Sequence, residues 1–77
     1  MKKIFTIYNV MPEFDSNSIE VSTTKELYDV IRKYWNVAPS RIQFGYNKYD
    51  KWYDVRLISK TGQTFAVIGE INFNPYE

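Results

Sequence analysis

The most regular pattern of apolar and polar positions in this chain lies between Thr23 and Val37. Apolar residues recur there at spacings of three and four, which places them on one face of a helix. These residues are Leu27, Val30, Ile31 and Tyr34. Thr23 followed by Glu26 is typical of a capping box, in which two side chains bond free amides of the first turn. Pro39 cannot continue a helix, so we expect the helix to end at Asn36 or Val37.

The remaining apolar segments are short, and most alternate apolar with polar residues as strands do. We expect strands at Lys3–Val10, Ile19–Ser22, Arg41–Asn47, Tyr53–Ser59 and Thr64–Phe73. Met11–Ser18 is rich in turn residues and predicts a loop, whereas Lys60–Gln63 with Gly62 predicts a tight hairpin turn. Gly69 interrupts the last strand and indicates a β-bulge or a close approach of the helix.

The predicted fold is α+β with the element order ββαβββ, in which one amphipathic helix packs on one face of a largely antiparallel five-stranded sheet. The chain of 77 residues predicts a single domain, 1–77. At the level of the fold, the hairpin, the helix, Pro39 and the strand ending Ile42-Gln43-Phe44-Gly45 resemble the β-grasp proteins related to ubiquitin. The resemblance includes no diagnostic motif and implies no function. The Gly62 turn makes the last two strands neighbours, which they are not in ubiquitin.

Alternation along the strands assigns their side chains to two faces of the sheet. The face toward the helix is expected to carry Phe5, Val55, Leu57, Val67 and Ile71. The open face is then expected to carry Ala66 and Glu70 together with a candidate interface, which consists of Ile4, Tyr8, Arg56, Ile58 and Ile68. A contiguous apolar patch on an open sheet is typical of a dimer or partner surface, although scattered exposed apolar residues are also ordinary.

Aromatic and charged residues are interleaved where two predicted strands meet. Tyr and Trp side chains supply large, rigid contact areas and are enriched in binding hot spots. We therefore assign binding to Tyr46, Lys48, Tyr49, Lys51, Trp52 and Tyr53. The alternative is that Trp52 and Tyr53 fold back over the edge of the sheet. On the helix, Tyr28 and Trp35 lie beside the apolar face, and we expect them to cover its edge against a strand rather than bind a ligand.

The chain contains neither Cys nor His, the residues of most zinc sites and most general bases. We therefore expect no catalytic residue, no metal site and no cofactor. The absence of Cys fits a reducing cytoplasm, and no apolar run is long enough to span a membrane. The start, MKKIFTIYNV, lacks the long apolar core of a signal peptide. We expect a cytoplasmic protein without a membrane partner.

Two classes of function are compatible with these features. The first is a non-enzymatic protein-binding module that acts by surface occlusion, such as a phage or mobile-element inhibitor of a bacterial protein machine, of the anti-CRISPR or another anti-defence type. Its partner would be another protein, with a homodimer through the open sheet face as a further expectation.

The second class is a single-stranded nucleic-acid-binding protein, in which aromatic side chains stack on bases and cationic ones contact phosphates. The stacking residues would be Tyr46, Tyr49, Trp52 and Tyr53, and the cationic ones Lys48, Lys51, Arg56 and Lys60. Asp50 and Asp54 lie within this patch, which should be positive, and the formal net charge is only +1. We therefore prefer a protein partner.

Overall fold

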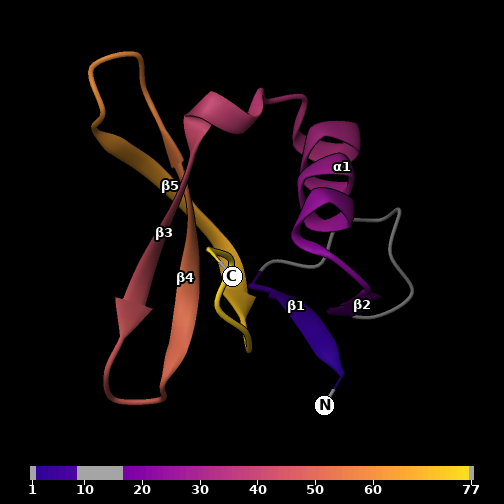
Figure 1. The fold of residues 1–77 in the computed structure, drawn as a ribbon. Helices are drawn as coiled ribbons and strands as arrows, with labels where there is room; N and C mark the ends of the chain where they lie inside the picture. Colours follow the sequence, from indigo (N-terminus) through magenta and orange to yellow (C-terminus); the bar gives the residue numbers. More distant parts are fainter. Residues whose placement is uncertain (1, 9–16, 77) are drawn as a thin grey trace.

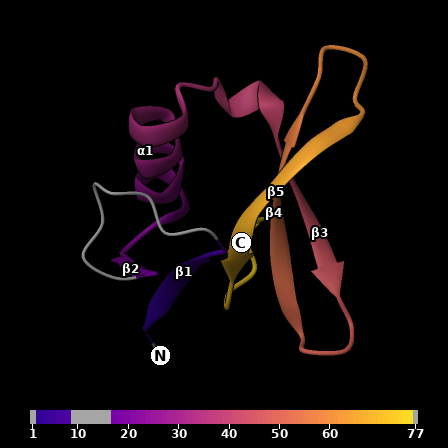
Figure 2. The ribbon, with the colours of Figure 1, turned by 180° about the vertical axis from the view of Figure 1, so that it is seen from behind.

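The computed structural model describes residues 2–8 and 17–76. They form β1 (Lys3–Ile7), β2 (Ser18–Val21), α1 (Thr24–Trp35), the short 3-10 helix η1 (Pro39–Arg41), β3 (Ile42–Asn47), β4 (Trp52–Ile58) and β5 (Thr64–Ile71). The strands make one antiparallel sheet of five strands in the order β2-β1-β5-β4-β3. Figure 1 shows α1 on one side of this sheet, with the β3–β4 and β4–β5 turns at opposite ends and away from the helix; Figure 2 shows the same arrangement from behind. The predicted α+β fold is confirmed.

Both ends of α1 are capped by side-chain or backbone contacts. The Thr23 hydroxyl accepts a hydrogen bond from the Glu26 amide at 3.1 Å, as the capping box predicts. The Glu26 carboxylate accepts from the amide of Ser22 at 2.9 Å, one residue earlier than in a standard box. At the other end Asn36 adopts a left-handed conformation with φ of 54° and donates to the Arg32 carbonyl, so the helix ends at Trp35.

The core lies between α1 and the sheet, and every buried residue in it is apolar. Its members are Phe5, Ile7, Val21, Leu27, Ile31, Ile42, Phe44, Val55, Leu57, Ile68, Ile71 and Phe73. Trp35 packs against Phe5 and Tyr28 packs against Phe44, each with ring centroids 6.0 Å apart. These two rings therefore cover the edges of the helix, as the sequence predicts.

Two register shifts in β5 change which of its side chains reach the core. Val55 pairs with Gly69 but Arg56 pairs with Val67, so Ile68 is an extra residue, as at a β-bulge. A second shift skips Phe65, between the pairs of Leu57 with Ala66 and of Ile58 with Thr64. The bulge expected at Gly69 is therefore present, and the close approach at Gly69 is made by the Thr6 carbonyl of β1 rather than by the helix.

The boundaries of several elements differ from the prediction. The expected strand Lys3–Val10 is observed as far as Ile7, and the expected loop Met11–Ser18 lies mostly outside the described residues. Trp52 begins β4 instead of ending a loop, because it pairs with Asn47. Asn72 follows β5, and its side-chain amide bonds the Ile4 amide at 2.7 Å and the Lys2 carbonyl at 2.9 Å. A side chain thus continues the contact with β1 where strand pairing ends.

The Gly62 turn makes β4 and β5 neighbours, as expected from the sequence. Gly62 has φ of 87°, a conformation that is strained for residues with a side chain. The resulting strand order is not that of ubiquitin, so the likeness to β-grasp proteins is limited to the arrangement of a hairpin followed by a helix.

Candidate binding surface

The loop between β3 and β4 is fixed by its own hydrogen bonds. The Asn47 side chain accepts from the Tyr49 amide at 2.9 Å, and the Asp50 side chain accepts from the Trp52 amide at 3.0 Å. The Lys51 amide donates to the Asn47 carbonyl at 2.8 Å, and Lys51 takes the left-handed conformation that closes the turn. The loop therefore presents Tyr49 in a defined position, with 89% of the residue exposed.

The predicted aromatic binding residues divide into exposed and packed members. Tyr46 is 55% exposed and contacts Tyr53 across the hairpin, with ring centroids 5.1 Å apart. Tyr53 packs against the core, and Trp52 is also only partly exposed. The alternative in which Trp52 and Tyr53 fold back onto the sheet therefore describes these two residues better. Tyr46 and Tyr49 are the exposed aromatic residues of this end of the hairpin.

A depression of about 440 Å³ adjoins these two rings. Its lining consists of Tyr46, Asn47, Lys48, Tyr49, Asp54 and Arg56. Gly45 lies between the lining residues, and the Arg56 guanidinium occupies the space that a side chain at Gly45 would need. The structure thus brings Arg56, predicted on the open face, together with Tyr46, Lys48 and Tyr49; Lys51, Trp52 and Tyr53 are not part of the lining.

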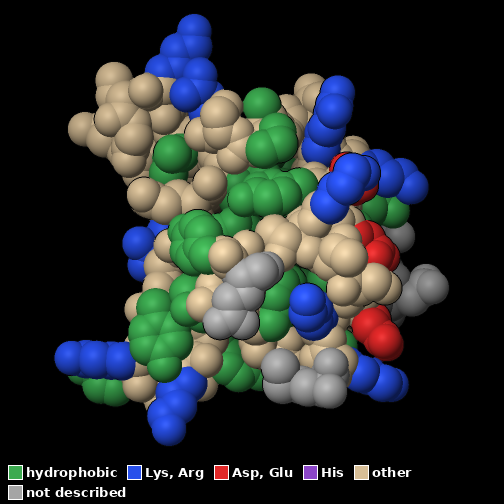
Figure 3. All heavy atoms as spheres, viewed as in Figure 1, with side chains coloured by type: hydrophobic (Ala, Val, Ile, Leu, Met, Phe, Trp, Pro, Cys, Tyr) green, Lys and Arg blue, Asp and Glu red, His purple; other side chains and the backbone are tan. Residues whose placement is uncertain are grey.

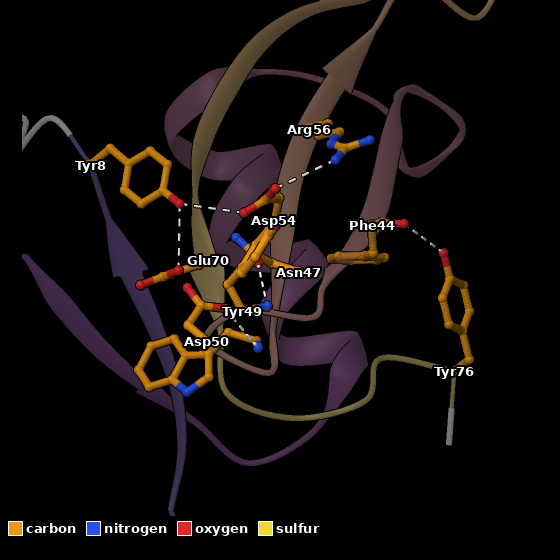
Figure 4. Close-up of polar contacts among 10 residues, drawn as sticks. Tyr8, Phe44, Asn47, Tyr49, Asp50, Asp54, Arg56, Glu70 and Tyr76 are labelled. Atoms are coloured by element: carbon orange, nitrogen blue, oxygen red, sulfur yellow. Dashed lines mark hydrogen bonds and ion pairs between the residues drawn. The ribbon is translucent and has the colours of Figure 1, made fainter.

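Carboxyl groups and one tyrosine hydroxyl meet beside the depression, on the open face of the sheet. Asp54 and Glu70 are direct neighbours across β4 and β5. Tyr8 donates its hydroxyl to Asp54 Oδ1 at 3.4 Å and to Glu70 Oε2 at 3.5 Å, and Figure 4 shows it pointing between the two carboxyl groups. Arg56 lies 3.4 Å from the other oxygen of Asp54. The Arg56 guanidinium therefore pairs with Asp54, whose neighbour across the strands is Glu70.

Burial and the neighbouring carboxyl groups raise two pKa values in this cluster. Burial raises the pKa of Glu70 above its ordinary value, and the neighbouring Asp50 and Asp54 raise it further, whereas the hydrogen bond from Tyr8 acts in the opposite direction. Burial, Glu70 and Asp54 raise the pKa of Tyr8 to about 12. Burial is therefore the main cause of both shifts, and the neighbouring carboxyl groups act in the same direction.

The predicted apolar interface on the open face contains one residue that is buried, and its other residues do not form a continuous patch. Ile68 is only 8% exposed and belongs to the core, because the bulge turns it toward the helix. Val67, expected in the core, is 40% exposed for the same reason. Ile4, Tyr8 and Ile58 keep some exposure, but the polar row formed by Thr6, Glu70 and Asp54 crosses the face and separates Ile4 from Tyr8 and Ile58.

The sequence interpretation missed two features of this surface. Phe65 is 64% exposed near the β4–β5 turn, although the alternation of β5 assigned it to the same face as Ile71. The contact of Tyr8 with Asp54 and Glu70 joins residues that are far apart in the chain, and no local pattern predicts it.

In Figure 3, which shows the side of the molecule seen in Figure 1, the visible Asp and Glu side chains lie on the side of the helix.

Within residues 2–8 and 17–76, no group of three or more Asp, Glu, His or Cys is arranged to hold a metal ion. The same described ranges contain no helix with the length and apolar character needed to cross a membrane. Comparisons with protein-family models, with curated proteins and with solved structures found no match for this chain.

Proposed function

We propose that this chain is a non-enzymatic protein-binding module whose binding surface is the exposed end of the β3–β4 hairpin with the adjoining depression. The observation that carries the proposal is the position of Tyr49. Its loop is held by hydrogen bonds that the side chains of Asn47 and Asp50 accept from backbone amides, yet Tyr49 is 89% exposed. An exposed aromatic ring on a loop that is already ordered offers a large contact area without the entropy cost of ordering the loop on binding, which is the property of a good anchor.

The charge around this anchor supports a protein partner. Asp54 lies in the depression and Glu70 is next to it, so carboxyl groups form part of the surface beside Tyr49. Phosphate groups are repelled by such a site, whereas a protein surface can present backbone donors and cationic side chains. In this proposal the domain acts by occupying a surface that its partner needs, as a phage or mobile-element inhibitor of a bacterial protein machine would.

Single-stranded nucleic acid is the second candidate ligand, and one observation favours it. The depression collects two exposed tyrosines with the cations Lys48 and Arg56, which is a combination used for stacking and phosphate contact. Arg56, however, forms an ion pair with Asp54. Lys48 is therefore the one of these two cations that has no carboxylate within ion-pair distance in the described part of the chain.

The test is affinity capture from a lysate, identification of the captured protein by mass spectrometry, and a titration of the purified partner. Tyr49→Ala is expected to weaken binding by about 2 kcal/mol, the typical loss at a hot spot. Phe65→Ala is the matched control, because Phe65 is another exposed aromatic residue at the opposite end of the sheet. Equal losses in both variants, or none in Tyr49→Ala, would contradict the proposed surface.

The same variants are then titrated with a single-stranded oligonucleotide at two salt concentrations. The proposal expects weak binding without dependence on Tyr49. Micromolar binding that falls steeply with salt and is lost in Tyr49→Ala would instead establish the nucleic-acid function.

A further inference from the structure

Three apolar side chains lie outside the core near the β4–β5 turn. Leu57 of β4 is buried toward the helix, so the next residue, Ile58, lies on the open face of the sheet. Val67 pairs with Arg56 on the same face and is 40% exposed, and Phe65, closer to the turn, is 64% exposed. We call Ile58, Phe65 and Val67 the turn patch. None of the three packs against the core, so the turn patch is free to contact another molecule.

The charged residues at this end of the sheet are cationic. Residues 36–49 and 55–69, which include η1, β3 and much of β4 and β5, contain no Asp or Glu. Lys60 lies in the β4–β5 turn itself. Arg41 precedes Ile42, and the pairing of Ile42 with Leu57 places Arg41 beside the end of β4. In Figure 3 the region over the β4–β5 turn, at the upper left, shows Lys or Arg side chains and no Asp or Glu.

Neither of these two cations is neutralised by a carboxyl group of the described residues. No Asp or Glu in residues 2–8 and 17–76 lies within ion-pair distance of Lys60 or Arg41. The carboxyl groups of the open face, Asp54 and Glu70, lie beyond Val67 and farther from the turn. An apolar centre with a cationic rim is complementary to apolar side chains that are flanked by carboxylates.

We propose that the turn patch binds an acidic amphipathic segment of another protein. The apolar side chains of that segment pack on Phe65 and Val67. Its carboxylates lie beside Lys60 and Arg41. Figure 1 shows the β4–β5 turn at the opposite end of the sheet from the β3–β4 turn, so this contact is separate from the proposed binding at Tyr49 and does not depend on it.

Two other anionic ligands fit the turn patch less well. Bases of single-stranded nucleic acid stack on aromatic rings, but Phe65 is the one aromatic member of the patch beside two aliphatic ones. A membrane surface takes up apolar side chains from the part of a protein that enters it. The tip of the hairpin, 60–63, is polar, and Phe65 and Val67 lie behind it. The aliphatic members of the patch therefore favour a protein ligand.

The experiment is a titration of the isotope-labelled full chain with a synthetic amphipathic peptide of leucine and glutamate, followed by amide chemical shifts. A second peptide carries glutamine in place of every glutamate. We expect saturable shifts at Ile58, Phe65 and Val67, and none at Tyr49. The glutamine peptide is expected to bind at least about ten-fold more weakly, because it lacks the charges that complement the cationic rim.

Three variants locate the contact. Phe65→Ala is expected to weaken binding of the glutamate peptide at least about ten-fold, as loss of an apolar anchor does. Lys60→Glu reverses a charge at the rim and is expected to weaken binding about three- to ten-fold. Lys33→Glu is the matched control, because it changes the net charge equally but lies on the exposed face of α1. It leaves the affinity unchanged. Phe65 and Lys60 are both exposed, so these variants keep the fold.

The proposal is overturned if the glutamate peptide causes no shifts at the turn patch or if both peptides bind equally. Equal losses in Lys60→Glu and Lys33→Glu would also overturn it, since only the overall charge would then matter. Vesicles of phosphatidylcholine and phosphatidylserine and a single-stranded oligonucleotide are titrated in parallel. Tighter binding of either one at the turn patch would overturn the choice of a protein segment in favour of a membrane or a nucleic acid.

Discussion

Asp54 and Glu70 lie directly opposite each other on β4 and β5, and the hydroxyl of Tyr8 donates a hydrogen bond to each of them. Like charges in directly opposed positions destabilise a sheet, and here the neutral hydroxyl of Tyr8, the residue after β1, and one guanidinium offset the repulsion. The arrangement makes the stability of the domain depend on pH in two separate ranges.

The first range concerns the Glu70 carboxyl. Its pKa is raised by burial and by Asp50, so the folded state holds this proton more strongly than the unfolded chain does. The contribution of Glu70 to stability is therefore present at low pH and is lost as pH rises from its ordinary value of 4.5 through the raised pKa. We expect Glu70→Gln to increase the free energy of unfolding at neutral pH. In this variant the free energy of unfolding should also fall less steeply as pH rises above 4.5. Urea unfolding at several pH values measures this, with Glu20→Gln as an exposed control.

The second range concerns the Tyr8 hydroxyl, whose pKa burial and the two carboxyl groups raise from 10.0 to about 12. The folded state favours the neutral hydroxyl, so stability is lost as pH rises through this interval. We expect Tyr8→Phe to lose less stability there than the parent protein does. Absorbance of tyrosinate in the folded protein should lack a late-titrating component in this variant, while Tyr28, whose pKa burial also raises, stays as an internal reference. Loss of an early-titrating tyrosine instead would show that Tyr8 is not in the cluster.

The helix–sheet core gives a prediction about stability. Leu27 and Ile31 are fully buried, so Leu27→Ala and Ile31→Ala should each lower the free energy of unfolding by about 2–4 kcal/mol. Lys33→Ala, on the exposed face of the same helix, should change it by less than about 0.5 kcal/mol. Chemical denaturation measures all three. Equal stability of the three variants would mean that another face of the helix packs on the sheet.

The bulge in β5 is tested by two neighbouring residues. Ile68→Ala should cost about 2–4 kcal/mol, because this side chain is buried, whereas Val67→Ala should cost less than about 0.5 kcal/mol. A regular strand would give the reverse order, since alternation without a bulge places Val67 in the core. The comparison of the two free energies of unfolding therefore reports the register directly.

The helix and the turns were predictable because their signals are local. The spacing of Leu27 and Ile31, the pair Thr23 and Glu26, and Gly62 in a tight turn each fix a conformation within a few residues. The assignment of β5 failed because a bulge depends on how the strand pairs with β4, and Gly69 was its only local sign. The same limit applied to the site: Tyr46 and Tyr49 were identified by composition, but Asp54 and Arg56 join them in one depression only through the pairing of β3 with β4.

The chain's last residues cross from one side of the sheet to the other. Asn72 is bonded to Ile4 of β1, Phe73 is buried, and Tyr76 is bonded to Phe44 of β3. An affinity tag or fluorescent protein attached behind Tyr76 would therefore start beside β3 and obstruct the surface that carries Tyr46 and Tyr49. A fusion before residue 1 would start next to Lys2 and β1, across the sheet from that surface. Immobilisation through the N-terminus is therefore the arrangement that leaves the proposed contact at Tyr49 open to measurement.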